Sequence, residues 1–467
     1  MRPKLIRALA RGTVVAGIAG AATVTGTALA QQADRLPGAD FFLDFRAGLT
    51  GTDNPERVAD PDGGEVRANT DLTLGYDSET RAQSFSARLF GRVQTEQEDG
   101  RAGLTDRSLR LSYDRTAANA ALGVDLRYEE QEIGFEFLEL DFEENVLTGA
   151  DLVVDTGIRR TLSYGLDLAL GQEGPVGLTL GIDGRQRRYD DADNADFVEE
   201  DRFSADARAR LALTRTADLI FLGSYSLRDA DDEAETYAVT GSFGAGLDVD
   251  ITPALSFEAS ASHSISEVTK TENGDRDTRR REAPTFRLGL TQQRPNGTIS
   301  IDAVRSLAST GPRTRVTVGR AVDLKSGELS GRAGVTVTED SWATTGQVSY
   351  THQMRNGDLR VALARSVRTN DDETDIASTR ADVSYRTQID RLSFLSLDMR
   401  VSADDALEDD AEDRSRASLG VTYSRALTED WSLQAGFRHS RAGSSDAETI
   451  AENRIFANIG RRFDLRP

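Results

Sequence analysis

Apolar and polar residues alternate along most of the chain. Residues 43–49 read Leu-Asp-Phe-Arg-Ala-Gly-Leu, and residues 122–128 read Leu-Gly-Val-Asp-Leu-Arg-Tyr. A period of two over about ten residues is that of a β-strand with one apolar and one polar face. No segment keeps the helical period of 3.6 residues for two turns, so the pattern predicts an all-β protein.

Segments of this kind predict about 22 strands, with 18 to 24 accepted. Their centres lie near residues 45, 72, 89, 110, 124, 163, 181, 208, 223, 242, 260, 288, 301, 317, 333, 347, 363, 383, 397, 420, 435 and 458, and those near 163, 317 and 347 are the weakest. Short turns, such as Met354 to Gly357, follow every second strand, and most other connections are longer and polar. This asymmetry is typical of outer-membrane barrels, whose short turns and termini face the periplasm.

The sheet is expected to close. Across a hydrocarbon layer every backbone donor and acceptor needs an internal partner, which leaves only the closed form open to a sheet. A soluble sandwich has fewer and shorter strands, a β-solenoid has a fixed repeat period that this chain lacks, and an acidic disordered chain lacks the alternation. The prediction is a closed antiparallel transmembrane β-barrel.

The N-terminus has the pattern of a secretory signal peptide. Arg2, Lys4, Arg7 and Arg11 precede an uncharged run from Thr13 to Val24, and the segment closes on Ala28-Leu29-Ala30. We expect cleavage after Ala30, with Ala28 and Ala30 as the small residues of the site. A membrane anchor is the alternative, but the run is shorter than the ~20 residues of a spanning helix. The predicted domains are a signal peptide (1–30), a short periplasmic segment (31–40) and the barrel (41–467).

The composition excludes several kinds of binding partner and cofactor. The net charge is −22, and loss of residues 1–30, which carry four positive and no negative charges, makes it −26; such a chain is not expected to bind nucleic acid. The absence of cysteine excludes disulfides, iron–sulfur clusters and cysteine-ligated zinc, and suits export through an oxidising periplasm. We predict no cofactor. A hydrophobic content of 38% fits a barrel, because only alternate residues face lipid.

Acidic runs occur in the predicted long connections. They are Asp190 to Asp193 continuing to Glu199-Glu200-Asp201, Asp229 to Glu235, Asp371 to Asp375, and Asp404 to Asp413. The simpler interpretation is that these runs form solvated loops. The more specific interpretation is that they bind divalent cations such as Ca²⁺, which are then the candidate partners. None of the runs has the spacing of a known calcium motif, so no metal site is predicted.

The last segment, residues 453–463, ends on Phe463 and looks like the closing strand that outer-membrane assembly machinery recognises. Aromatic residues beside short turns predict an interfacial girdle: Tyr76, Tyr113, Tyr350, Tyr385, Tyr423 and Trp431. In outer-membrane barrels the last residue is usually aromatic, whereas here Asp464-Leu465-Arg466-Pro467 follow Phe463, so Phe463 is assigned this role internally. With this tail the chain resembles β-barrel porins of alphaproteobacteria. The resemblance implies the bacterial outer membrane as location, and outer-membrane lipid, lipopolysaccharide and the assembly machinery as partners.

The size of the barrel bears on its class. Barrels of about 22 strands in the TonB-dependent transporter family carry an N-terminal plug domain. The first strand of this chain is expected near Phe41, about ten residues beyond the cleavage site, so we predict no plug. The expected lumen is therefore wide.

The polar faces of the strands supply the candidate lumen-lining residues: Arg88, Arg92, Arg110, Arg127, Arg208, Arg210, Arg400, Arg438, Asp44, Asp125, Asp206 and Asp398. Such an arginine is either the cross-strand partner of a carboxylate or part of a ring that selects ions. The favoured function is a porin-like passive channel for small polar solutes or ions. A conduit or docking barrel for a secreted polymer such as exopolysaccharide, or a structural barrel without flux, is the alternative.

Catalysis is not expected. His263 and His439 each precede a serine, but adjacent residues of a strand point to opposite faces and do not form a nucleophile and base pair. No catalytic, cofactor or metal residue is assigned.

Overall fold

The computed structural model describes residues 38–95, 102–133, 139–141, 146–148, 157–191, 197–232, 234–272, 275–339, 341–369, 374–407, 413–445 and 448–465. Within them, 22 strands form one sheet. The barrel strands are β1 (Gly38–Thr52), β2 (Glu65–Glu79), β3 (Gln83–Thr95), β4 (Ala102–Ala117), β5 (Ala120–Glu132), β8 (Ile158–Leu170), β9 (Val176–Asp190), β10 (Glu199–Ala212), β11 (Ala217–Asp231), β12 (Tyr237–Thr252), β13 (Leu255–Glu272), β14 (Asp275–Arg294), β15 (Gly297–Leu307), β16 (Pro312–Leu324), β17 (Gly327–Val337), β18 (Trp342–Met354), β19 (Gly357–Thr369), β20 (Asp375–Asp390), β21 (Ser393–Ala406), β22 (Arg414–Ala426), β23 (Trp431–Ser444) and β24 (Ile450–Asp464).

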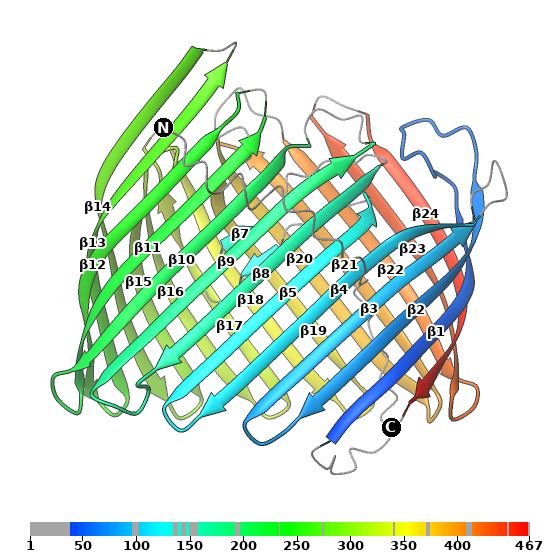
Figure 1. Cartoon of the computed structure of the whole chain (residues 1–467), viewed down its shortest axis with the longest axis horizontal. Coiled ribbons are helices and arrows are strands. Elements are labelled where there is room, and N and C mark those ends of the chain that lie inside the picture. The colour runs from blue at the N-terminus through cyan, green and yellow to red at the C-terminus, as the bar shows by residue number, and fades with distance from the viewer. Residues whose placement is uncertain are drawn as a thin grey trace.

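The sheet closes on itself (Figure 1). Each barrel strand pairs antiparallel with the next one along the chain, and β1 pairs with β24 from Phe42 opposite Asp464 to Thr52 opposite Arg454. The predicted barrel of 22 strands is confirmed, and every predicted strand centre falls within a strand. β1 begins at Gly38, three residues before the predicted start of the barrel at Phe41. The predicted signal peptide, with Ala28 and Ala30, lies outside the described residues.

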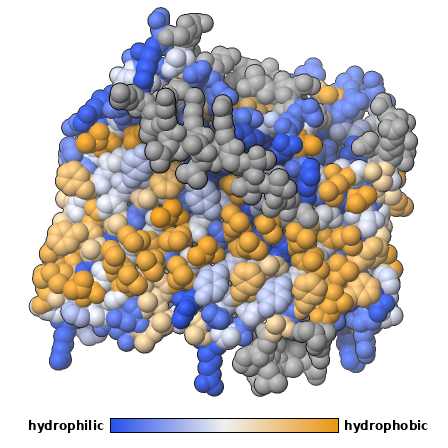
Figure 2. All heavy atoms as spheres, in the orientation of Figure 1, coloured by the Kyte–Doolittle hydropathy of each residue, from blue (hydrophilic) through white to orange (hydrophobic). Residues whose placement is uncertain are grey.

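The pairing register gives the wall two chemically different faces. Residues directly opposite each other on antiparallel strands project to the same side of the sheet. Leu43, Leu74, Leu89 and Leu109 follow one another in this way from β1 to β4. Residues of this face are exposed although they are apolar; Val66 is 69% and Ile455 is 65% exposed. Figure 2 shows an apolar belt across the face of the wall in view, with polar residues toward both rims. Such a belt is expected of a surface in contact with lipid.

No helix within the described ranges is long and apolar enough to cross a membrane.

The two rims differ as the alternation of connections predicts. Short turns gather at one end of the barrel, and longer connections rise from the other, where the hairpin of β13 and β14 projects farthest (Figure 1). β1 begins and β24 ends at the short-turn rim. Phe463 lies there opposite Leu43 on the outer face, and the Arg461 guanidinium stacks on the rings of Phe463 and Trp431, at 4.7 and 5.5 Å from their centroids. An aromatic edge with a cationic neighbour is typical of a membrane interface.

Two short strands lie within the connection between β5 and β8. β6 (Glu139–Asp141) pairs with β7 (Val146–Thr148), and β7 lies against β19 and β20. In the order of the barrel, β19 and β20 stand opposite β5 and β8. β7 therefore lies against the wall opposite to the two strands that flank it in the sequence.

Candidate functional site

The inner face of the barrel is the candidate functional surface. The register places all the predicted lumen-lining residues on this face, opposite to the apolar belt: Arg88, Arg92, Arg110, Arg127, Arg208, Arg210, Arg400, Arg438, Asp44, Asp125, Asp206 and Asp398. Strand alternation alone predicts which face of the wall each residue occupies, because successive side chains point to opposite faces.

Many inner-face arginines bind carboxylates that the sequence did not single out. Arg88 Nη2 lies 2.7 Å from Asp77 Oδ2. Arg92 bridges two strands through Asp71 Oδ1 at 2.7 Å and Asp106 Oδ2 at 2.8 Å. Further pairs join Arg127 to Glu129, Arg208 to Asp248 and Glu258, Arg210 to Asp218, and Arg400 to Asp382. Most of these partners stand on a neighbouring strand, and finding them requires the register.

The predicted aspartates behave differently. Among the described residues, none of Asp44, Asp125, Asp206 and Asp398 has a cationic group within 4.0 Å. Two of them belong to a larger group of exposed carboxylates on the inner face of β4 to β10, which we call the acidic wall: Asp114, Asp125, Asp167, Asp183 and Asp206.

Glycines make room for these carboxylates. Gly181 stands directly opposite Asp206, whose carboxylate occupies the space that a side chain at 181 would fill. Gly165 does the same for Asp183, because a Cβ there would lie 3.2 Å from Asp183 Oδ1. The acidic wall therefore alternates carboxylates with bare backbone, and Gly181 is the position at which a larger side chain would displace a carboxylate most.

A hollow of about 240 Å³ lies on the inner face near the short-turn rim, where β11 to β15 run side by side. It is lined by one row of directly opposed residues: Asp218, Asp248, Glu258, Gly289 and Asp302. Arg208 and Arg210 bind three of its carboxylates, so this hollow is more nearly neutral than the acidic wall.

One carboxylate is buried on the inner face and shared by arginines from adjacent strands. Glu200 of β10 is 2% exposed. Its Oε2 accepts a hydrogen bond of 2.8 Å from Arg202 Nε and lies 3.4 Å from Arg228 Nε of β11, and its Oε1 lies 3.4 Å from Arg187 Nη1 of β9. A buried charge needs this kind of multiple pairing to offset its desolvation.

A second buried cluster lies near the long-connection rim. Arg368 of β19 donates to Asp404 Oδ2 at 2.7 Å and to Ser378 Oγ at 2.8 Å, and Ser378 in turn donates to Asp404 Oδ1. These residues connect β19, β20 and β21 on the inner face, next to the strands that β7 reaches.

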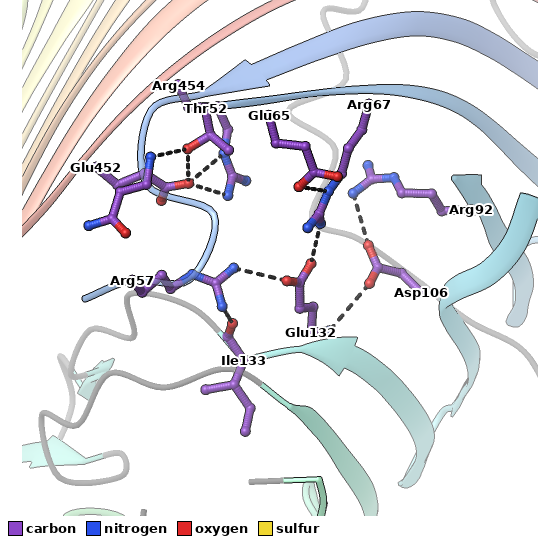
Figure 3. A network of polar contacts seen from close by, with 11 residues as sticks. Thr52, Arg57, Glu65, Arg67, Arg92, Asp106, Glu132, Ile133, Glu452 and Arg454 are labelled. Atoms are coloured by element: carbon purple, nitrogen blue, oxygen red, sulfur yellow. Dashed lines mark hydrogen bonds and ion pairs between the residues drawn. The ribbon is translucent and has the colours of Figure 1, made fainter. Parts of the chain in front are cut away.

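The connection between β1 and β2 is held to the end of β5 by polar contacts (Figure 3). The Arg57 guanidinium donates to the Ile133 carbonyl and lies 3.3 Å from Glu132 Oε1. Arg67 Nη1 is 3.5 Å from Glu132 Oε2, and the Glu132 backbone amide donates to Asp106 Oδ1. This network fixes the point at which the connection containing β6 and β7 leaves the wall.

The acidic runs are partly strand rather than loop, which corrects the predicted loop boundaries. Glu199 to Asp201 begin β10, Asp229 to Asp231 end β11, and Asp404 lies in β21, because the strands extend beyond the apolar belt. Arginines bind several of these carboxylates, as Arg188 does Asp201 at 2.7 Å and Arg313 does Asp375. Among the residues that the structure describes, no three histidine or acidic residues are grouped to hold a metal ion. The run from Asp371 to Glu373 lies outside the described residues.

The histidines stand on separate strands and on the outer face. His263 Nε2 is 3.5 Å from Glu282 Oε2, His352 Nδ1 is 3.3 Å from Ser326 Oγ, and His439 Nδ1 is 2.9 Å from Asn453 Oδ1. No contact shown for them combines a serine, a histidine and a carboxylate, the combination that nucleophilic hydrolysis uses.

Solved structures with a similar fold are bacterial outer-membrane β-barrels. The FrpB iron transporter of Neisseria meningitidis matches with a TM-score of 0.55 and 9% identity, over 91% of this chain and 81% of that one. The ferric-catecholate import receptor Fiu of E. coli K12 matches with a TM-score of 0.57 and 8% identity, over 92% and 82%. The siderophore receptor PiuA of Acinetobacter baumannii matches with 0.56 and 10%, over 91% and 82%.

These likenesses show the fold. The three matched proteins are TonB-dependent receptors, which have a plug domain. No plug domain is found among the described residues of this chain. No model of a known protein family matches the sequence, and no curated protein matches it. The resemblance to porins of alphaproteobacteria therefore stays a prediction.

Proposed function

We propose that this protein is an outer-membrane channel through which small polar solutes and ions diffuse. The proposal rests on the chemical difference between the outer and inner faces of a closed barrel. An apolar belt faces outward, and the inner face carries charged and hydroxyl side chains from nearly every strand. A face of this kind favours water in the lumen, and a barrel of this strand number is wide.

The proposed mechanism is sieving by width and by charge. The inner-face ion pairs give a polar wall that water and solutes contact, and β7 lies against β19 and β20, which stand opposite β5 and β8 in the barrel. No resident cofactor and no catalytic step are assigned. The short turns face the periplasm in this proposal, and the longer connections face the exterior.

The proposed partners are outer-membrane lipid around the belt, lipopolysaccharide at the long-connection rim and the assembly machinery at the closing strand. On the outer face at that rim, Arg160 contacts Glu130 at 3.4 Å and Asp190 at 2.6 Å and is still 45% exposed. A half-exposed guanidinium at this level of the wall suits the phosphates of lipopolysaccharide. Divalent cations would join the same phosphates to the acidic rim.

Vesicle permeability tests the proposal. Vesicles containing the folded protein are expected to swell in an isotonic monosaccharide solution at a rate that rises with protein content, because the solute enters through the lumen. Swelling should slow as the sugar grows from monosaccharide to tetrasaccharide, as sieving requires. Light scattering follows the swelling, with protein-free vesicles as the control. Vesicles that hold folded protein and stay as tight as the control would favour a polymer-docking or structural barrel instead.

A further inference from the structure

We infer that the rim ends of β19 and β20 set the size limit of the channel, because they lie inside the barrel and are held there by Arg313. The inference rests on the proposed channel function and adds the part of the fold that excludes larger solutes. The rim ends are Ser366 to Thr369 of β19 and Asp375 to Ser378 of β20, which pair with each other at the long-connection rim.

The first step is a break in the pairing of the wall. The pairing of β18 with β19 runs from their short turn to Gly346 opposite Arg365 and ends there. Both strands extend beyond this point, β18 as far as Trp342 and β19 as far as Thr369. Over these extensions β18 stays paired with β17, and β19 stays paired with β20. The rim ends therefore separate from β18 together.

The second step is the direction in which the rim ends lie. On the outward-facing side of β19, Leu363 is 45% exposed, whereas Val367 on the same side is 7% exposed. Val367 and the directly opposed Ala377 form a buried apolar cluster with Ala343 of β18. Ala343 is on the inner face, because side chains alternate along a strand and its neighbour Trp342 points outward, 66% exposed. The side of the rim ends that would face outward in the wall thus packs on the inner face of β18.

The third step is a polar contact that reaches across two strands. Arg313 lies on the inner face of β16, and β17 and β18 separate this strand from β19. Arg313 forms an ion pair with Asp375 and donates a hydrogen bond of 2.6 Å to Thr369 Oγ1. Thr310 donates to the same carboxylate at 2.8 Å. These contacts form because the rim ends lie over the inner face of β17 and β18.

The rim ends cover inner-face residues of β16 to β18. Thr317, Thr336 and Thr345 are 5%, 4% and 5% exposed, although their side of the wall faces the lumen. β7 also lies against β19 and β20. The rim ends thus occupy part of the lumen at the long-connection rim, and the width of a passage decides which solutes enter it.

The wall has room to take the rim ends back. Continuing the register of β18 and β19 would place Thr345 opposite Ser366 and Trp342 opposite Thr369, so the two extensions match in length. The ion pair with Arg313 and the apolar cluster hold the rim ends inside instead. Removing one charge of a buried pair leaves the other charge uncompensated, which strongly destabilises the arrangement that buries it.

Uptake of neutral sugars tests the inference, because it depends on width and not on charge. Vesicles that contain the Asp375→Asn protein should admit longer oligosaccharides than the parent admits, and sugars near the limit of the parent should enter about twofold faster. Arg313→Gln breaks the same pair from the other side and should act alike. The double variant leaves neither charge unpaired, so its size limit should return toward that of the parent.

Cysteine labelling reports the position of the rim ends without relying on permeability. The chain has no cysteine, so Ala343→Cys supplies a single thiol. In the parent background this thiol should react slowly with a charged maleimide, because Ala343 is 6% exposed beneath the rim ends. In the Asp375→Asn background the reaction should be about tenfold faster, since access controls the reactivity of a thiol.

A neighbouring ion pair supplies the matched control. Asp405 of β21 lies 2.6 Å from Arg365, the last residue of β19 that pairs with β18, on the outward-facing side of both strands. Asp405→Asn removes the same charge beside the rim ends. It should leave the sugar size limit and the labelling rate unchanged.

The outcomes separate this inference from the proposed channel. Unheated gel migration first establishes that each variant is folded. The role of the rim ends is overturned, and the channel stands, if the parent takes up sugars and both single variants keep its size limit. Rapid labelling of Ala343→Cys in the parent background, or an equal effect of Asp405→Asn, overturns it as well. A folded parent that takes up no sugar overturns the channel and the size limit with it.

Discussion

Replacing Glu200 by glutamine is expected to destabilise the folded barrel by about 3–5 kcal/mol, because it removes a buried charge that three arginines share. Glu200 is 2% exposed and contacts Arg187, Arg202 and Arg228 from β9, β10 and β11. Glutamine has the same shape but carries no charge, so the arginines would remain close together without the carboxylate that offsets their mutual repulsion. The measurement is the temperature at which the protein loses its compact, unheated migration in a detergent gel.

A neighbouring acid on the same strand supplies the control. Asp201 pairs with Arg188 at 2.7 Å, but both side chains are about one third exposed, and exposed pairs contribute ~0–1 kcal/mol. Asp201→Asn should therefore change the unfolding temperature little. Equal shifts for the two variants would show that Glu200 has no special role in joining these strands.

The second large effect is expected at the seam between β1 and β24. Gly48 of β1 stands opposite Asn458 of β24, and a Cβ at Gly48 would overlap both the Asn458 side chain and the carbonyl oxygen of Ala457. Backbone cannot move aside as a flexible side chain does, so Gly48→Ala must separate the strands that close the barrel. Overpacking of this kind costs about 1–3 kcal/mol or more. We expect a clear loss of the fraction that folds, read as the share of protein with compact, unheated gel migration.

Gly51 in the same strand is the matched position. A Cβ there meets Val66 Cγ2 at 3.7 Å and Glu65 O at 3.8 Å, which are ordinary van der Waals distances. Gly51→Ala should fold like the parent. If Gly48→Ala and Gly51→Ala fold to the same extent, the seam does not have the close approach described.

The strands and their two faces could be predicted because both follow from a local period. Leu43, Phe45 and Leu49 identify β1 and its outer face from seven residues of sequence, with no information about any neighbour. The same alternation gave the inner-face side of Arg88, Arg92 and the other candidates. Connection length then predicted which rim holds the short turns.

The ion pairs could not be predicted, because they depend on the register between strands. Arg92 binds Asp71 and Asp106, which are 21 and 14 residues away in sequence, beside a β-bulge at Gly91 and Val93 that shifts the pairing. A one-residue slip moves every side chain of a strand to the other face, so composition cannot replace the register. The acidic wall was missed in part for this reason, since its glycine spacing appears only across strands.

The sequence also could not predict how far the strands extend beyond the membrane. Glu199 to Asp201 have the composition of a solvated loop, but they continue β10 and bind arginines of neighbouring strands. At a barrel rim a strand is polar on both faces, so the hydrophobic pattern stops before the strand does. The contact of β7 with β19 and β20 likewise could not be predicted from the sequence.

Conductance of single molecules in planar bilayers tests the central claim most directly. Folded, heat-modifiable protein added to one side of a bilayer should give stepwise current increases of similar size, each ohmic at low voltage, because every inserted barrel opens a water-filled path. The same preparation after heating should give none. Folded protein that inserts into the bilayer and carries no current would contradict the account of this barrel as a channel.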